Sequence, residues 1–296
     1  MAETDVPWTV RRLLEWTTPF FSRKQVDAPR LSAELLLADV LKIPRIKIYT
    51  DYERPLTEKE LATFRDLVRR AGEQEPVAYL TGVAHFFNLE FEVTRDVLIP
   101  RPDTEVLVEQ VIQLLRTQVG MESPRILDLC TGSGCVAAAI AHNIKSAAVT
   151  ATDLSPKAVA IARKNVQRLG LDQRVLVEEG DLYEALGNSV DRQPFHLIVA
   201  NPPYIPSGQI EKLDRTVRDY EPKIALDGGM DGLDFHRRIL ARAGERLVAG
   251  GHAFLEIAFD QGEAALEVAG GFADFESPRL LKDYGGRDRV VTMRRK

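Results

Sequence analysis

The chain has 296 residues, of which 45% are hydrophobic and 28% are charged, and its formal net charge is −5. This length suffices for two domains of ordinary size, and the composition excludes a disordered or collagen-like chain. The net negative charge argues against a protein that mainly binds nucleic acid, since phosphate binding usually requires a basic excess. A local basic patch is still compatible with this net charge.

The two cysteines, Cys130 and Cys135, are five positions apart. This spacing matches neither a disulfide framework nor a zinc site, so we expect two reduced thiols, no metal and a cytoplasmic protein. Residues 1–15 have no apolar core of the signal-peptide type. The longest charge-free stretch, 193–210, contains four prolines and cannot form a membrane helix.

Residues 1–80 show helical periodicity. Leu35, Leu36, Val40 and Leu41 form an apolar stripe at helical spacing, which predicts a helix over 32–41. Thr57 and Glu60 form a capping box, which predicts that the next helix begins there and ends near Gly72. Prolines lie between these segments, so we expect a small helical bundle with proline-containing turns.

Residues 81–103 form a transition. Alternating apolar residues over 86–93 predict a short strand or hairpin. Two prolines, Pro100 and Pro102, then stiffen a loop in which Asp103 could cap a helix over 104–116.

From residue 124 onward, strand and helix patterns alternate. The expected strands are 125–129, 147–152, 175–178, 195–200, 252–257, one near Phe275 and 289–293, and the expected helices are 136–144, 156–169, 234–247 and 260–269. Such alternation predicts an α/β fold with a doubly wound, mostly parallel sheet of seven strands covered by helices on both faces.

Acidic residues follow three consecutive strands, where a sheet of this kind binds its ligands. The first strand carries Asp128 near its end and continues into a glycine-rich turn up to Gly134. The second ends at Asp153, whose carboxylate could accept both hydroxyls of a ribose. The third ends at Asp181, which could accept an adenine amine while the apolar Leu182 covers the ring.

No single one of these features decides the cofactor. Residues 132–137 satisfy a Gly-x-Gly-x-x-Ala dinucleotide pattern, so a NAD enzyme fits this segment equally well. Any one acid could be only a helix cap or a turn residue. Three acids together with the glycine turn favour a cofactor of the adenosyl type.

The fourth strand ends in Asn201-Pro-Pro-Tyr204. The Asn201 side chain and the Pro202 backbone each present a carbonyl, and both could accept hydrogen bonds from one planar –NH2 group. Tyr204 supplies a flat wall against which a planar group can lie. The motif therefore fits an amide or an exocyclic amine better than a nicotinamide, the alternative being a proline-rich loop after a buried strand.

With this motif the sequence resembles the class I S-adenosylmethionine-dependent methyltransferases, and more narrowly the PrmC/HemK family of release factor glutamine methyltransferases. The resemblance extends over nearly the whole chain and includes residues 75–82, 98–109 and 283–291. It implies methylation of the glutamine in the Gly-Gly-Gln motif of bacterial peptide chain release factors. N5-methylglutamine and S-adenosyl-L-homocysteine would be the products.

The resemblance also implies the roles of individual residues. The cofactor residues would be Asp128, Cys130, Thr131, Gly132, Ser133, Gly134, Asp153, Asp181, Leu182 and Asn201, and the glutamine would be held by Asn201, Pro202, Pro203 and Tyr204. Of these, Asn201, Pro202 and Tyr204 would be catalytic. Cys130 stands where the family has a glycine, and Leu182 where relatives can carry an aromatic residue, so the turn must accept a side chain and adenine would lack stacking.

The expected organisation is a recognition domain over 1–80, a linker or hairpin over 81–103 and a methyltransferase domain over 104–296. The N-terminal domain would bind the release factor, or else would only pack as a cap. We expect a monomer that binds neither membrane nor nucleic acid directly. Arg101 could contact cofactor or substrate or be a surface charge.

Three other functions stay open. The runner-up is an N-methyltransferase for an exocyclic amine of DNA or RNA, since such an amine resembles an amide –NH2. A non-catalytic protein that keeps the cofactor pocket and a NAD dehydrogenase are the others.

Overall fold

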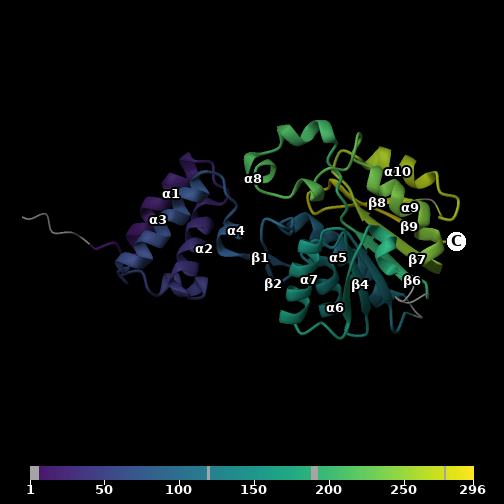
Figure 1. The fold of residues 1–296 in the computed structure, drawn as a ribbon, viewed down its shortest axis with the longest axis horizontal. Coiled ribbons are helices and arrows are strands. Elements are labelled where there is room, and N and C mark those ends of the chain that lie inside the picture. The colour runs from purple at the N-terminus through teal and green to yellow at the C-terminus, as the bar shows by residue number, and fades with distance from the viewer. Residues whose placement is uncertain (1–6, 119–120, 188–192, 277) are drawn as a thin grey trace, which may run out of the picture. The chain divides into compact units, whose positions relative to one another are not determined.

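A computed structural model describes residues 7–118, 121–187, 193–276 and 278–296. The chain divides into two compact units (Figure 1). Unit 1 comprises residues 1–83 and 214–220, and unit 2 comprises residues 84–213 and 221–296. No helix among the described residues has the length and apolar composition needed to cross a membrane.

Unit 1 is a helical bundle. Its elements are α1 (Val10–Arg23), α2 (Pro29–Leu41), the 3-10 helix η1 (Arg45–Tyr49), α3 (Glu58–Gly72), α4 (Val77–Thr81) and the short α8 (Arg215–Arg218). The predicted capping box is confirmed, since the Thr57 hydroxyl accepts from Glu60 N and the Glu60 side chain accepts from Thr57 N. The stripe predicted for 32–41 is partly wrong, because Leu37 rather than Leu35 joins the bundle core.

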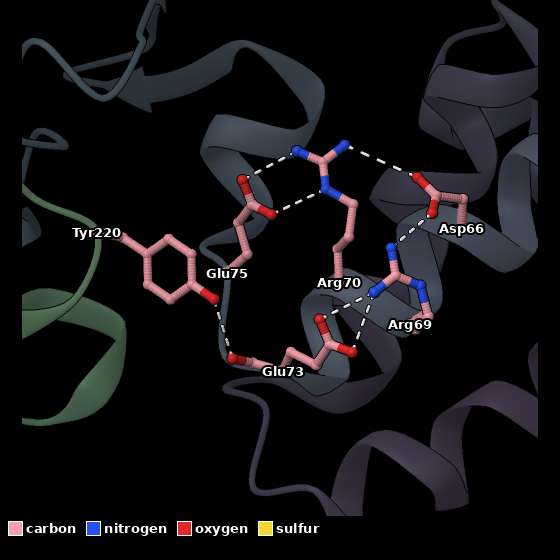
Figure 2. A network of polar contacts seen from close by, with 6 residues as sticks. All are labelled: Asp66, Arg69, Arg70, Glu73, Glu75 and Tyr220. Atoms are coloured by element: carbon pink, nitrogen blue, oxygen red, sulfur yellow. Dashed lines mark hydrogen bonds and ion pairs between the residues drawn. The ribbon is translucent and has the colours of Figure 1, made fainter.

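A polar network closes the end of α3 (Figure 2). Arg70 binds the buried carboxylate of Glu75 through two hydrogen bonds of 2.8 and 2.9 Å, and Arg69 pairs with Asp66 and Glu73. The Tyr220 hydroxyl donates to the backbone carbonyl of Glu73 at 3.1 Å. The Tyr220 contact attaches residues 214–220 to the bundle, although that segment is distant in sequence.

Unit 2 contains a seven-stranded sheet in the order β5-β4-β3-β6-β7-β9-β8. The strands are β3 (Arg125–Leu129), β4 (Ala148–Asp153), β5 (Val175–Glu179), β6 (Phe195–Ala200), β7 (Leu247–Glu256), β8 (Arg279–Lys282) and β9 (Asp288–Arg294). β3 to β7 are parallel, and β9 is antiparallel to both β7 and β8. The predicted doubly wound, mostly parallel architecture is confirmed.

Helices cover both faces of this sheet (Figure 1). They are α5 (Glu105–Thr117), α6 (Cys135–Asn143) and α7 (Pro156–Arg168) on one side, and α9 (Asp234–Arg246) and α10 (Gly262–Gly270) on the other. Strand residues alternate between the two cores: Ile126 packs with the first group of helices and Leu127 with the second. The remaining short 3-10 helices are η2 (Pro102–Thr104), η3 (Leu182–Leu186), η4 (Ser207–Lys212) and η5 (Lys223–Ala225).

The hairpin expected before the sheet is present as β1 (Val83–Phe86) and β2 (Leu89–Glu92), which form a separate two-stranded sheet. Its turn residues, Phe87 and Asn88, have φ values of +50° and +61°. Both turn residues of a type I′ hairpin require positive φ, which suits the twist of the flanking strands.

Two local expectations are wrong. The strand expected near Phe275 is only an isolated bridge to Arg295, and the strand lies at Arg279–Lys282 instead. Asp103 does not cap α5, because the N-cap residue is Thr104 and makes no side-chain cap; Asp103 forms an ion pair of 2.9 Å with Arg289. The buried guanidinium of Arg289 offers this carboxylate a stronger partner than the helix amides do.

Candidate active site

A cavity in unit 2 opens at the carboxyl ends of β3, β4 and β6. It brings together eight of the predicted site residues, namely Asp128, Cys130, Thr131, Gly132, Ser133, Asp153, Asn201 and Pro203. These residues come from three strand ends separated by up to 75 positions of sequence. Their convergence is what a doubly wound sheet produces at its ligand-binding edge.

The turn after β3 is held by the buried carboxylate of Asp128. Its Oδ2 accepts from the Thr131 hydroxyl at 2.6 Å and from Ala137 N at 3.2 Å, near the start of α6. Burial raises the pKa of Asp128 to about 7, and these hydrogen bonds oppose the rise. Asp128 therefore shapes the turn, and Gly134, which lies outside the cavity lining, lets the turn enter α6 with a φ of +80°.

Cys130 takes a left-handed φ of +58°. A glycine adopts this conformation without cost, whereas a side chain is strained by it. The structure thus accommodates the departure from the family pattern: the thiol is free, packs against the second core of the sheet, and has a pKa raised well above its ordinary value by burial.

Asp153 holds the other side of the same turn. Its two carboxylate oxygens accept from Gly132 N at 2.8 Å and from Ser155 N at 2.9 Å. Burial raises its pKa, and the two backbone N–H groups oppose the rise. Each oxygen keeps further acceptor capacity toward the cavity that Asp153 lines.

Asp181 and Leu182 are not part of the cavity lining. Asp181 pairs with Arg238 at 2.6 Å, and Leu182 is buried in the second core with a left-handed φ of +51°. Their predicted contacts with an adenine ring stay a prediction.

The motif after β6 is tied to the segment before α5. Asn201 Nδ2 donates to the Thr104 hydroxyl oxygen at 3.1 Å, and both residues line the cavity. Pro202 and Pro203 are buried. The Tyr204 hydroxyl donates to the Glu256 carboxylate at 3.4 Å, and burial raises the pKa of Tyr204 well above its ordinary value.

The sequence did not indicate the residues that hold the backbone of this motif in place. Gln261 Nε2 donates to the Tyr204 carbonyl at 2.9 Å, and Gly228 N donates to the carbonyl of Ile205 at the same distance. A Cβ at Gly232 would lie 2.2 Å from the Tyr204 carbonyl oxygen. The cluster Gly-Gly-Met-Asp-Gly at 228–232 was the signal that such a close approach exists.

Asn165 was missed as well. This fully buried side chain of α7 donates to the Ser133 carbonyl at 2.9 Å and exchanges two hydrogen bonds with the backbone of Glu92. It fixes the glycine turn to the hairpin, so Asn165 stabilises the cavity wall from outside the cavity.

Arg101, whose role the sequence left open, lines the cavity and forms an ion pair with the buried carboxylate of Glu221. Burial raises the pKa of Glu221, and Arg101 opposes that rise. Arg101 is therefore more than a solvated surface charge.

Metal ligands do not gather in the described part of the chain, where no group of three or more His, Cys, Asp or Glu side chains is placed to hold an ion.

His236 is buried, contacts the Glu256 carbonyl at 2.7 Å, and has a pKa lowered to about 4 by burial. It is therefore neutral at physiological pH.

Comparison with known proteins adds the family. Residues 12–82 match the model of the PrmC N-terminal domain, and residues 103–217 match that of the methyltransferase small domain. The release factor glutamine methyltransferase of Geobacter sulfurreducens is 42% identical over 98% of this chain and 98% of its own. That of Rhodopirellula baltica is 40% identical over 100% of both chains.

The chain belongs to the release factor glutamine methyltransferase family. A solved methyltransferase from Pyrococcus furiosus, 19% identical, matches with a TM-score of 0.50 and covers 71% of this chain and 90% of its own. At that identity the match supports the fold alone. The family assignment confirms the resemblance that the motifs indicated and excludes a dehydrogenase.

Proposed function

We propose that this chain transfers a methyl group from S-adenosylmethionine to the side-chain amide nitrogen of the glutamine in the Gly-Gly-Gln motif of peptide chain release factors. The products would be N5-methylglutamine and S-adenosyl-L-homocysteine. One observation carries the proposal: Asn201 shares a cavity with the glycine turn and Asp153. The names of relatives that match over the whole chain support the same substrate.

The residues of the cavity fit the cofactor. Asp153 retains acceptor capacity for two ribose hydroxyls, and a Cβ built at Gly132 meets nothing within 4 Å, so the turn leaves room for a ligand. Bound S-adenosylmethionine supplies an electrophilic methyl group on a positively charged sulfur. Asp153 would orient it through the ribose, and the backbone of 130–133 would line the adjoining wall.

The protein must then aim an amide nitrogen, which is a poor nucleophile because its lone pair is delocalised. The carbonyls of Asn201 and Pro202 would accept the two hydrogens of the substrate –NH2 and restrain its plane. Such positioning can lower a barrier by up to about 7–11 kcal/mol. These hydrogen bonds strengthen as nitrogen gains positive charge, so they stabilise the transition state more than the bound substrate.

Mass spectrometry of a release factor incubated with the enzyme and S-adenosylmethionine tests the proposal. We expect one added methyl group on the Gly-Gly-Gln peptide and none on a release factor whose glutamine is replaced by alanine. Asn201→Ala should lower kcat by about 100-fold or more while changing cofactor affinity far less. Methylation of DNA or RNA without methylation of the protein would contradict the proposal and support the alternative.

We further propose that unit 1 recognises the release factor. A groove between α1 and α3 is lined by the aromatic residues Trp8, Trp16, Phe20 and Phe64 and by the basic residues Lys24, Arg65 and Arg69. Trp16 stacks on Phe20 at 5.3 Å yet is 51% exposed. Exposed aromatic side chains beside cationic ones are typical of surfaces that bind other proteins.

A further inference from the structure

The strongest unexplained feature of the site is a buried carboxylate behind the Asn-Pro-Pro-Tyr motif. Glu256, at the end of β7, has no exposed surface. Its Oε1 accepts from the Tyr204 hydroxyl at 3.4 Å, and its Oε2 has no partner of ordinary hydrogen-bond geometry among the described residues. A buried carboxylate with so few donors is costly and attracts any hydroxyl hydrogen nearby.

Thr104 carries a hydroxyl near this carboxylate. Burial raises the pKa of Glu256 to about 7, and hydrogen bonding with Thr104 is the largest effect opposing this rise, ahead of the charge of Arg289. Thr104 is itself 2% exposed and has a single hydroxyl hydrogen. When that hydrogen points to the Glu256 carboxylate, the Thr104 oxygen can only accept a bond from its other neighbour.

That neighbour is Asn201, whose Nδ2 donates to Thr104 at 3.1 Å. The two ends of an asparagine amide have nearly the same shape, so packing alone would not decide which end faces the cavity. An acceptor at Thr104 does decide it, because only the NH2 end can donate. The carbonyl oxygen Oδ1 is then left for the cavity that Asn201 lines.

We propose that Thr104 and Glu256 are positioning residues that orient the Asn201 amide, so that the site presents a carbonyl to its substrate and selects an –NH2 group over a carboxylate. The proposal rests on the proposed function for the identity of the substrate. A glutamine side chain would donate to Asn201, whereas a glutamate would place a negative oxygen against the same carbonyl. Selection of this kind arises from leaving polar groups unpaired with the wrong substrate.

The experiment compares Thr104→Val, which keeps the shape and removes the hydroxyl, with Thr104→Ser, which keeps the hydroxyl. We expect Thr104→Val to lower kcat on a Gly-Gly-Gln peptide by roughly 10- to 100-fold, with cofactor affinity changed less than about 3-fold. Thr104→Ser should retain kcat within about 3-fold of the unaltered enzyme. Equal losses in both variants, or no loss in Thr104→Val, would overturn the proposal.

Glu256→Gln completes a double-mutant cycle. If both residues act through Asn201, Thr104→Val combined with Glu256→Gln should be no slower than Thr104→Val alone, whereas independent roles would give losses that multiply. Thermal unfolding of each variant checks that the fold persists. Multiplying losses in folded variants would contradict the proposal.

Calorimetry separates this inference from the proposed function. With S-adenosyl-L-homocysteine bound, the unaltered enzyme should bind a Gly-Gly-Gln peptide more tightly than a Gly-Gly-Glu peptide, and Thr104→Val should reduce that ratio. Equal ratios in the two proteins would reject the orienting role even if methylation is observed. If the unaltered enzyme instead methylates no release factor, the proposed function fails while a changed ratio still supports the orienting role.

Discussion

Gly232 has a φ of +81°, and the space beside its Cα is filled by the Tyr204 carbonyl. We expect Gly232→Ala to destabilise the protein by about 2 kcal/mol or more, because the added methyl both strains the backbone and displaces the motif. Urea unfolding measures the change. Gly208→Ala is the matched control, since nothing lies within 4 Å of its Cβ and its φ is ordinary. Equal stability of the two variants would contradict the prediction.

The backbone at Cys130 disfavours branched side chains. Its φ of +58° lies in the left-handed region, where a β-branched side chain is strained most. We therefore expect Cys130→Val to lower the free energy of unfolding by roughly 1–2 kcal/mol, while Cys130→Gly relieves the strain and retains methyltransferase activity. Denaturant titration distinguishes them. A Cys130→Val protein as stable as Cys130→Gly would show that the turn relaxes to accept branching.

At the scale of residues, the sequence was informative where chemistry imposes a residue type. The acids at the ends of β3 and β4 and the asparagine after β6 were predicted because strand ends converge in such a sheet, and they line one cavity. Thr104, Glu256 and Gln261 were not predicted, since their contacts join segments up to 152 positions apart and leave no local pattern. Only the fold places them beside the motif.

Among the elements, the connection from β3 to α6 makes a contribution to the stability of the protein that depends on pH. Asp128 has a pKa of about 7 in the folded protein against 3.8 ordinarily, so the folded state binds its proton more tightly. Its contribution to stability is present below pH 3.8 and is lost as the pH rises toward 7. In the unaltered protein this decline in the free energy of unfolding is at most about 1.4 kcal/mol per pH unit, and it should be absent in Asp128→Asn. Urea unfolding at pH 5, 6 and 7 checks it; identical slopes would contradict it.

Helix α3 offers a test of local structure in unit 1. Thr57→Ala removes the N-cap of the capping box and should cost about 1 kcal/mol of stability. Thr63→Ala is the control, because Thr63 is exposed on the same helix and its hydroxyl donates to the backbone carbonyl of Lys59. We expect that control to stay within about 0.5 kcal/mol of the unaltered protein in thermal or denaturant unfolding. A larger loss from Thr63→Ala would point to a different source of helix stability.

Elements with a strong local period were predicted closely, and those defined by distant partners were not. β3 and β6 begin and end where the alternating pattern placed them. α8 has four residues and no buried side chain, so its sequence carries no periodic signal. β8 exists because β9 pairs with it, and its exposed and half-buried residues do not read as a strand.

For the molecule as a whole, the proposed division of labour predicts separable kinetic effects. Trp16→Ala should raise KM for an intact release factor by roughly 3-fold or more, because it removes an aromatic contact from the groove, and should leave KM for a short Gly-Gly-Gln peptide unchanged. Ile46→Ala, 70% exposed in unit 1 but outside the groove, is the control. An equal rise for peptide and protein would contradict recognition by unit 1.

The path of the chain has a mechanical consequence. The polypeptide passes between the two units at 83/84, 213/214 and 220/221, so three covalent connections join them instead of one. After proteolytic cleavage following Val83, the helical bundle would stay bound to residues 214–220 of the remaining chain. Its hydrogen bonds to Tyr220, of 3.1 Å, and to Thr216, of 3.3 Å, would persist. A bundle expressed as residues 1–83 alone would lack residues 214–220. A fragment that ends at residue 83 therefore lacks part of unit 1, and the fragment 84–296 carries residues 214–220 without the bundle that binds them.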